Sequence, residues 1–72
     1  MNRTTIRKRL VSAADGAEFV TQGDIRKALG CGPHRAIQIT AGLDFIKFNR
    51  MKQYDVDEVA GRIYESVERS GA

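Results

Sequence analysis

Three polar side chains in the middle of the chain have the chemistry to recognise nucleic-acid bases. His34, Arg35 and Gln38 have the spacing i, i+1 and i+4, so on a helix they share one face. An arginine can donate two hydrogen bonds to guanine, and a glutamine can pair with adenine in the same way. A solvated helix surface often carries the same residue types, so this spacing leaves both interpretations open.

A second group of polar residues is mainly basic and lies on either side of the first. Arg26 and Lys27 come before it, in a segment with helical spacing, where a cation can contact phosphate without reading sequence. The residues that follow it could reach the backbone or the minor groove, which favours arginine; they are Lys47, Asn49, Arg50 and Lys52. Exposed turns are commonly polar, so a purely solvated surface is the alternative for this group too.

The residue types give no support to catalysis. Cys31 is the only cysteine and His34 the only histidine, which excludes an internal disulfide and a cysteine zinc site. The chain also lacks a Gly-rich phosphate loop and a nucleophile with its base, and so small a domain has little room for a closed pocket. We therefore expect no enzymatic activity, no metal and no cofactor, and we expect Cys31 to be a small, partly buried apolar residue.

Length and composition predict one soluble domain. Of the 72 residues, 42% are hydrophobic and 29% charged, a mixture typical of globular proteins. No apolar run approaches the roughly 18 residues that cross a bilayer. The basic N-terminal segment is not followed by the apolar stretch of a secretory signal. These features favour a cytoplasmic protein with no membrane partner.

The net charge of +3 conceals an uneven distribution. Residues 1–54 carry ten Lys or Arg and four Asp or Glu, whereas residues 55–72 carry two and five. A basic body with an acidic C-terminal segment is typical of a protein that binds a polyanion. Scattered charge without a binding role is the alternative.

Apolar spacing predicts three helices in the first part of the chain. Residues 4–14 form the first, on the periodicity of their apolar side chains. Thr21 caps the second, with Asp24 completing a capping box, and Gly30 ends it. Pro33 suits the first position of the third helix, which runs to about residue 41 and should turn its apolar side chains and one threonine inward: Ala36, Ile37 and Thr40.

After Gly42 the period of the pattern changes from 3.6 to 2. This change predicts a β-hairpin over about 44–56, with a basic tip of four or five residues around Asn49–Lys52. Aromatic residues at alternating strand positions are expected in the core: Phe19, Phe45, Phe48 and Tyr54. A final helix over about 56–69 follows, and part of its apolar stripe could serve a homodimer or a partner protein: Val59, Ile63, Tyr64 and Val67. Packing of this stripe within the monomer is the alternative.

The order of these elements is helix, short strand, helix, tight turn, helix, hairpin, helix. Two short helices joined by a Gly-containing turn are the helix-turn-helix unit, and the flanking strand and hairpin extend it to a winged helix. Several segments carry a resemblance to a known family: Phe19-Val20-Thr21, Asp24 to Gly30, the helix from Pro33, Phe45 to Phe48, and Gln53 to Val59. Over residues 19–63 the chain resembles the small excisionase and MerR-type winged helix-turn-helix DNA-binding proteins. It departs from them in its extra N-terminal helix and in the lack of glycine at the tip.

The resemblance implies a fold and a function. The fold is a mostly helical α+β domain spanning residues 1–72, with a three-helix core, a hairpin wing and a C-terminal helix. The function is sequence-preferring binding to double-stranded DNA, as in a small transcriptional regulator or an excisionase-like architectural factor of a mobile element or phage. Two alternatives stay open: a protein-interaction adaptor on the same scaffold, and an RNA-binding module.

Overall fold

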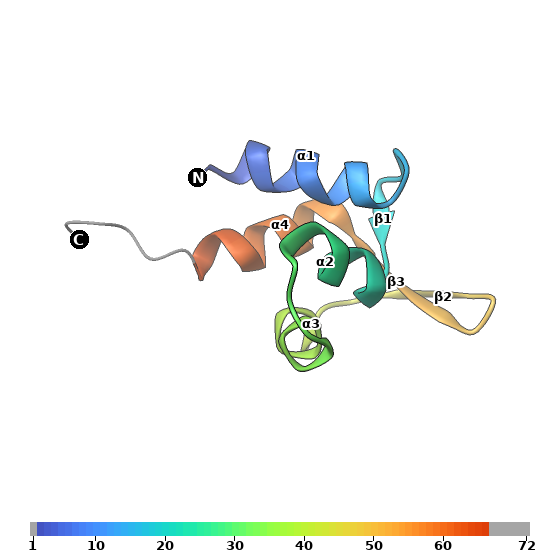
Figure 1. The fold of residues 1–72 in the computed structure, drawn as a ribbon. Coiled ribbons are helices and arrows are strands. Elements are labelled where there is room, and N and C mark those ends of the chain that lie inside the picture. The colour runs from blue at the N-terminus through green and yellow to red at the C-terminus, as the bar shows by residue number, and fades with distance from the viewer. Residues whose placement is uncertain (1, 67–72) are drawn as a thin grey trace.

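Four helices and a small antiparallel sheet make up residues 2–66, the part of the chain that the computed structural model describes (Figure 1). In chain order the elements are α1 (Arg3–Ala13), β1 (Phe19–Val20), α2 (Gln22–Leu29), α3 (Pro33–Thr40), β2 (Ile46–Phe48), β3 (Met51–Asp55) and α4 (Val56–Glu65). The predicted α+β class, dominated by helices, is confirmed. The predicted order of elements is also the observed one.

The ends of α2 and α3 are determined by local chemistry that the sequence displays. The Thr21 hydroxyl accepts from the Asp24 N–H at 3.1 Å, and the Asp24 carboxylate accepts from the Thr21 N–H at 3.0 Å, so the predicted capping box is present. Gly30 ends α2 with a left-handed φ of 64°, which glycine adopts without strain. Pro33 begins α3 as predicted.

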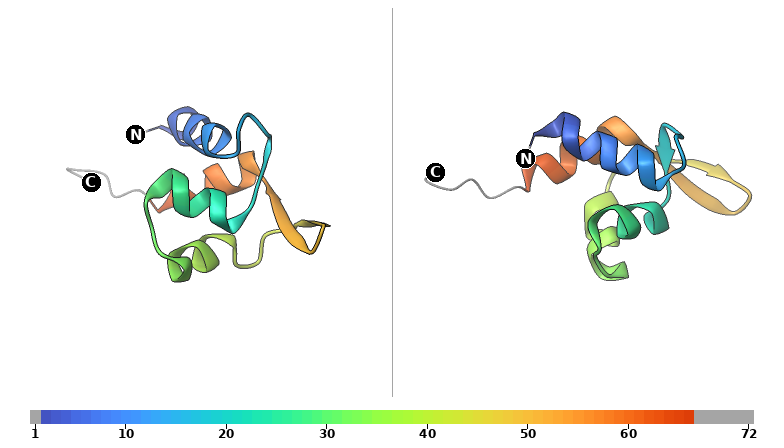
Figure 2. Two further views of the ribbon diagram at one scale, coloured as in Figure 1. Left: turned by 45° about the vertical axis from the view of Figure 1, so that its right-hand side comes forward. Right: turned by 45° about the horizontal axis from the view of Figure 1, so that its top comes forward.

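One apolar core joins all the helices to the inner end of the sheet. Helices α1 and α4 lie side by side, and α2 packs against both α1 and α3 (Figures 1 and 2). The largest fully buried side chains come from both strands and helices: Ile6, Leu10, Val20, Ile25, Val56 and Val59. The long-range packing of α1 on α4 closes the domain around the α2–α3 pair.

The hairpin turns more tightly than predicted. Phe48 pairs with Met51, so only Asn49 and Arg50 form the turn, and both have positive φ, 50° and 66°. Positive φ at both central residues is what a two-residue type I′ turn requires. The predicted tip of four or five residues was therefore wrong, because Met51 and Lys52 already belong to β3.

The aromatic residues are less buried than predicted. Tyr54 is 4% exposed and lies in the core, but Phe19, Phe45 and Phe48 are 41%, 48% and 61% exposed. The strand order is β1-β3-β2, and the β2–β3 hairpin projects beyond the helices (Figure 2). The helices therefore cover only the inner end of the sheet. Ile37 on α3 was also expected to face inward, but it is 55% exposed because Ala36, Ile39 and Thr40 form the buried side of that helix.

The final helix is described from Val56 to Glu65, with Ser66 as its C-cap. The rest of its predicted range to residue 69, including Val67, lies outside the described residues. Val59 and Ile63 were expected as candidates for a partner surface, but they are buried within the monomer, at 0% and 9% exposure. Tyr64 packs against the core and is partly buried.

Candidate nucleic-acid interface

Helix α3 presents a polar surface on the side opposite its buried residues. His34 and Gln38 lie at the centre of this exposed surface, one helical turn apart, with His34 Nε2 and Gln38 Nε2 separated by 3.4 Å. Ile37 lies beside them and is also exposed. The exposed surface thus combines hydrogen-bonding groups with one apolar side chain, and such a combination can contact both base edges and a thymine methyl group.

Arg35 was predicted together with His34 and Gln38, but the structure places it at one edge of that surface. It lines a hollow of about 670 Å³ between α3 and α4, together with Arg62 and Ile63. Arg62 donates to the carbonyl oxygen of Ala41 at 2.8 Å, so α4 caps the C-terminal end of α3. Gln38 also reaches this hollow, so the predicted residues are neighbours, although they do not point in one direction.

A buried hydroxyl fixes the angle between α2 and α3. Gln22 Nε2 donates to Thr40 Oγ1 at 3.1 Å, and Thr40 Oγ1 donates to the Ala36 carbonyl at 3.0 Å. Thr40 is 4% exposed, so both bonds form away from solvent and hold the start of α2 against the end of α3. The Gln22–Thr40 hydrogen bond therefore links α3 to the start of α2.

The predicted basic residues of the hairpin lie together on it. Lys47 and Lys52 are directly opposite each other across β2 and β3, so their side chains extend from the same face. Lys52 Nζ lies 4.8 Å from the centre of the Phe45 ring, in a cation–π contact. Like charges at a directly opposed pair destabilise a hairpin. The pair therefore costs stability in the isolated protein, a cost that a bound anion would remove.

The hairpin tip lies close to the N-terminal end of α2. Arg50 and Lys52 line a hollow of about 350 Å³ with three residues at that helix end: Thr21, Gln22 and Gly23. Arg50 and Lys52 make the hairpin side of this hollow positive, whereas the Asp24 carboxylate in the capping box offsets the partial positive charge of the helix end. Asn49 lies exposed at the tip beside Arg50.

The basic residues of α2 do not line the hollow at the hairpin tip. Arg26 and Lys27 are both exposed, as predicted. Lys27, however, lines a separate hollow of about 470 Å³ between α1 and α2, with Lys8 and Arg9. In Figure 1, α1 lies on one side of α2 and α3 on the other. The side chain of Lys27 therefore belongs with α1 and away from the exposed face of α3.

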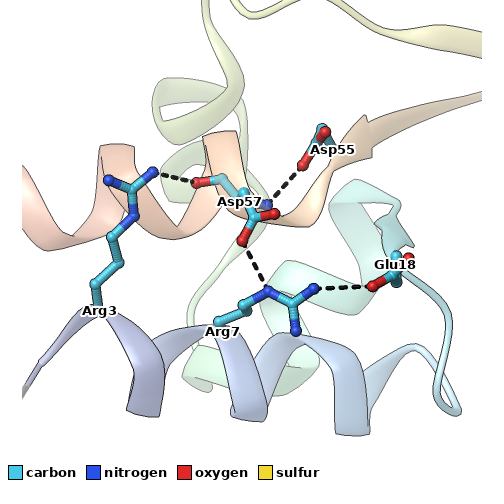
Figure 3. Close-up of polar contacts among 5 residues, drawn as sticks. All are labelled: Arg3, Arg7, Glu18, Asp55 and Asp57. Atoms are coloured by element: carbon cyan, nitrogen blue, oxygen red, sulfur yellow. Dashed lines mark hydrogen bonds and ion pairs between the residues drawn. The ribbon is translucent and has the colours of Figure 1, made fainter.

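Two arginines of α1 are occupied by internal contacts (Figure 3). Arg7 Nε donates to Asp57 Oδ1 at 2.7 Å, and Arg7 Nη2 donates to Glu18 Oε1 at 3.0 Å. Arg3 Nη2 donates to the Asp57 carbonyl at 3.0 Å, and an added Cβ at Gly61 would lie 2.9 Å from that same nitrogen. These contacts fasten α1 to the start of α4.

The same contacts determine the electrostatics of this side of the domain. The hydrogen bond to Asp57, with that to Glu18, raises the pKa of Arg7 above its ordinary value. A raised pKa means that the ion pairs are complete below the ordinary value and weaken only as the pH rises through the raised one. Arg7 therefore stays charged and paired at any pH near neutrality. The sequence did not reveal these pairs, since the partners are 11 and 50 residues away.

Within residues 2–66 no three His, Cys, Asp or Glu side chains converge as metal ligands would. Nor does any helix in that range combine the length and apolar character that crossing a bilayer requires. Comparisons of the chain with models of protein families, with curated proteins and with solved structures find no match. The function must therefore be argued from the geometry of the domain itself.

Proposed function

We propose that this protein is a winged helix-turn-helix domain that binds double-stranded DNA with sequence preference. The observation that carries the proposal is the basic hairpin, which extends beyond the helices with Lys47 and Lys52 on one face and Arg50 at its tip. None of these three residues improves the stability of the free protein. The lysines repel each other, and Arg50 has a left-handed backbone that disfavours residues other than glycine. A bound polyanion would give all three cationic side chains a favourable electrostatic contact.

The proposed complex places two elements against the duplex. Helix α3 enters the major groove with His34, Ile37 and Gln38 towards the bases. The hairpin follows the neighbouring backbone or minor groove, where its cations contact phosphate. The hollow between Arg50 and the start of α2 would take one phosphate group, held by the hairpin and the helix end together.

The resemblance to excisionase and MerR-type proteins suggests a small regulator or an architectural factor. One domain of this size buries little DNA surface, so tight binding requires a second copy or a neighbouring protein. The alternative is an adaptor that uses the same scaffold to bind a protein. The exposed phenylalanines of the hairpin favour that alternative, and the test below separates the two.

The test is a titration of fluorescent random-sequence duplex with the full chain, repeated over a range of salt concentrations. The double variant Lys47→Gln/Lys52→Gln should bind more weakly, and its slope of log K against log salt should be shallower by about 2 units, one for each lost phosphate contact. The matched control is Lys8→Gln/Arg9→Gln, which removes the same charge from α1 and should leave the slope unchanged.

Two results would count against the proposal. Absence of binding at about 50 mM salt, where non-specific binding is strong, would favour the adaptor. Equal losses in the hairpin variant and the α1 variant would show that only net charge matters. Competition with double-stranded and single-stranded RNA of the same length distinguishes DNA from RNA as the ligand.

A further inference from the structure

The outer face of the sheet is an exposed apolar surface. Cross-strand neighbours point to the same side of a sheet, so the pairing places alternate residues together on the face turned away from the core. Buried Val20 and Tyr54 identify the opposite face as the core side. The outward residues are apolar over most of its length, and we call them the outer face: Phe19, Ile46, Phe48 and Met51, with Gln53 and Asp55.

Each of the four apolar side chains on this face is between 41% and 61% exposed. Single exposed apolar residues are common, but here four gather on one face of three short strands, with Gln53 and Asp55 of the central strand between Phe19 and Ile46. The patch spans the sheet from Phe19 on β1 to the Phe48–Met51 pair next to the turn. A patch of this kind marks an interaction surface on a protein that otherwise has an ordinary polar exterior.

The charges around the outer face are arranged with opposite signs at its two ends. Asp44, Asp55 and Glu58 surround its inner end, where they line a hollow of about 210 Å³ with Phe19 and Ile46. Arg50 lies at the other end, at the tip of the turn. Asp55 lies five positions after Arg50 along the chain, or roughly 16 Å at the usual rise per strand residue.

A surface that is acidic at one end, apolar in the middle and basic at the other is complementary to its own copy turned by 180°. In that arrangement the acidic end of each copy meets Arg50 of the other copy. The apolar residues of the two copies meet between these contacts. Interfaces of two-fold symmetric dimers are self-complementary in this way. We infer that the outer face of the sheet is the surface through which two copies of this chain associate.

This association does not depend on DNA binding. Lys47 and Lys52 extend from the opposite face of the hairpin, so a contact between them and phosphate leaves the outer face uncovered. Arg50, at the tip, is the one residue that the dimer and the proposed phosphate contact would share. The dimer would also supply the second copy that a small DNA-binding domain needs. The test below contains no nucleic acid, so its failure would leave the proposed function untouched.

The experiment is sedimentation equilibrium of the full chain from about 10 µM to about 1 mM, the range in which weak interfaces dissociate. The average mass should rise from 8.0 kDa towards twice that value. The variant Phe48→Ser should raise the dissociation constant at least about tenfold, because Phe48 is the most exposed apolar side chain of the outer face and a buried aromatic residue contributes much of an interface's affinity. A thermal melt verifies that this exposed substitution leaves the domain folded.

Charge reversal tests the proposed orientation. Arg50→Glu and Asp44→Arg should each weaken association at least about fivefold, because each places like charges together, and the double variant should restore it. Lys47→Glu makes the same charge change as Arg50→Glu on the opposite face of the hairpin, so it should have no effect. A chain that stays monomeric at 1 mM, a dimer insensitive to Phe48→Ser, or a double variant that is no better than the single ones would each overturn the inference.

Discussion

Three polar residues of helix α3 lie in different surroundings in the folded domain. His34 and Gln38 lie on the side of α3 opposite its buried residues, whereas Arg35 lies at the edge of that side; Arg35 and Gln38 both line the hollow beside Arg62 and Ile63 of α4. Helical spacing alone places the three residues in one group, because it takes no account of the helices that pack against α3. In the proposed complex Gln38 would face the bases, and Arg35 would approach the DNA backbone from the side.

We expect Gln38→Ala to reduce specificity without reducing general affinity. Loss of a bidentate base contact costs about 1–3 kcal/mol on the preferred sequence and nothing on scrambled DNA, since glutamine carries no charge. Arg35→Ala should weaken both by similar factors if it contacts phosphate. The measurement is a titration of each variant with a site selected from a random pool and with its scrambled version. A proportional loss on both sequences for Gln38→Ala would show that α3 does not read bases.

Two features of the β2–β3 hairpin, its turn and its opposed lysines, lower its stability. Its two turn residues both have positive φ, which asparagine tolerates well and arginine does not. The opposed lysines add electrostatic repulsion in the strands next to the turn. A hairpin selected for stability alone would have glycine at position 50 and opposite charges at positions 47 and 52.

Arg50→Gly should therefore stabilise the domain and weaken DNA binding. Relief of the left-handed backbone outweighs the added flexibility of glycine by about 0.5–1 kcal/mol, which raises the Tm by roughly 3–6 °C in a domain of this size. The lost cation should make the salt slope shallower by about 1 unit. Asn49→Gly is the matched control, with a smaller gain in Tm and no change in slope. A lower Tm for Arg50→Gly would mean that the arginine side chain makes stabilising contacts of its own.

For the whole molecule, the fold divides the basic residues into two groups. Arg7 forms ion pairs with the carboxylates of Asp57 and Glu18, and Arg3 donates to the backbone carbonyl of Asp57 (Figure 3). The hairpin cations and the start of α2 form the second group, on another part of the surface. Ion pairs within the domain thus neutralise part of the excess positive charge of residues 1–54, and only the remaining charge is available to a polyanion.

We expect the double variant Arg3→Gln/Arg7→Gln to lower the Tm and to leave the salt slope of DNA binding unchanged. The arginines fasten α1 to α4, so their loss loosens the packing that closes the domain. The pairing already neutralises Arg7, so its removal takes no cation from the surface proposed to bind DNA. Thermal melts followed by circular dichroism, with salt titrations below the melting range, measure both effects. A shallower slope together with a normal Tm would place α1 in the DNA interface instead.

The sequence by itself determined the features that depend on neighbouring residues. The capping box of Thr21 and Asp24, the glycine end of α2, the proline start of α3 and the period-2 hairpin are all confirmed, because hydrogen bonds and backbone preferences within a few residues decide them. The basic residues predicted for the hairpin do lie on it, and their contact with DNA stays a prediction. Only the exact turn was misjudged, since Phe48 and Met51 pair closely enough to leave a two-residue loop.

The tertiary structure alone decided which surfaces are exposed. Alternation in the hairpin predicted buried aromatic residues, but Phe19, Phe45 and Phe48 are exposed, because the sheet extends past the helices that would have covered them. Likewise, the internal pairing of Arg7 depends on residues that the fold brings together from 11 and 50 positions away. Periodicity shows that one face of a strand differs from the other, but whether anything covers a face depends on the packing of distant elements.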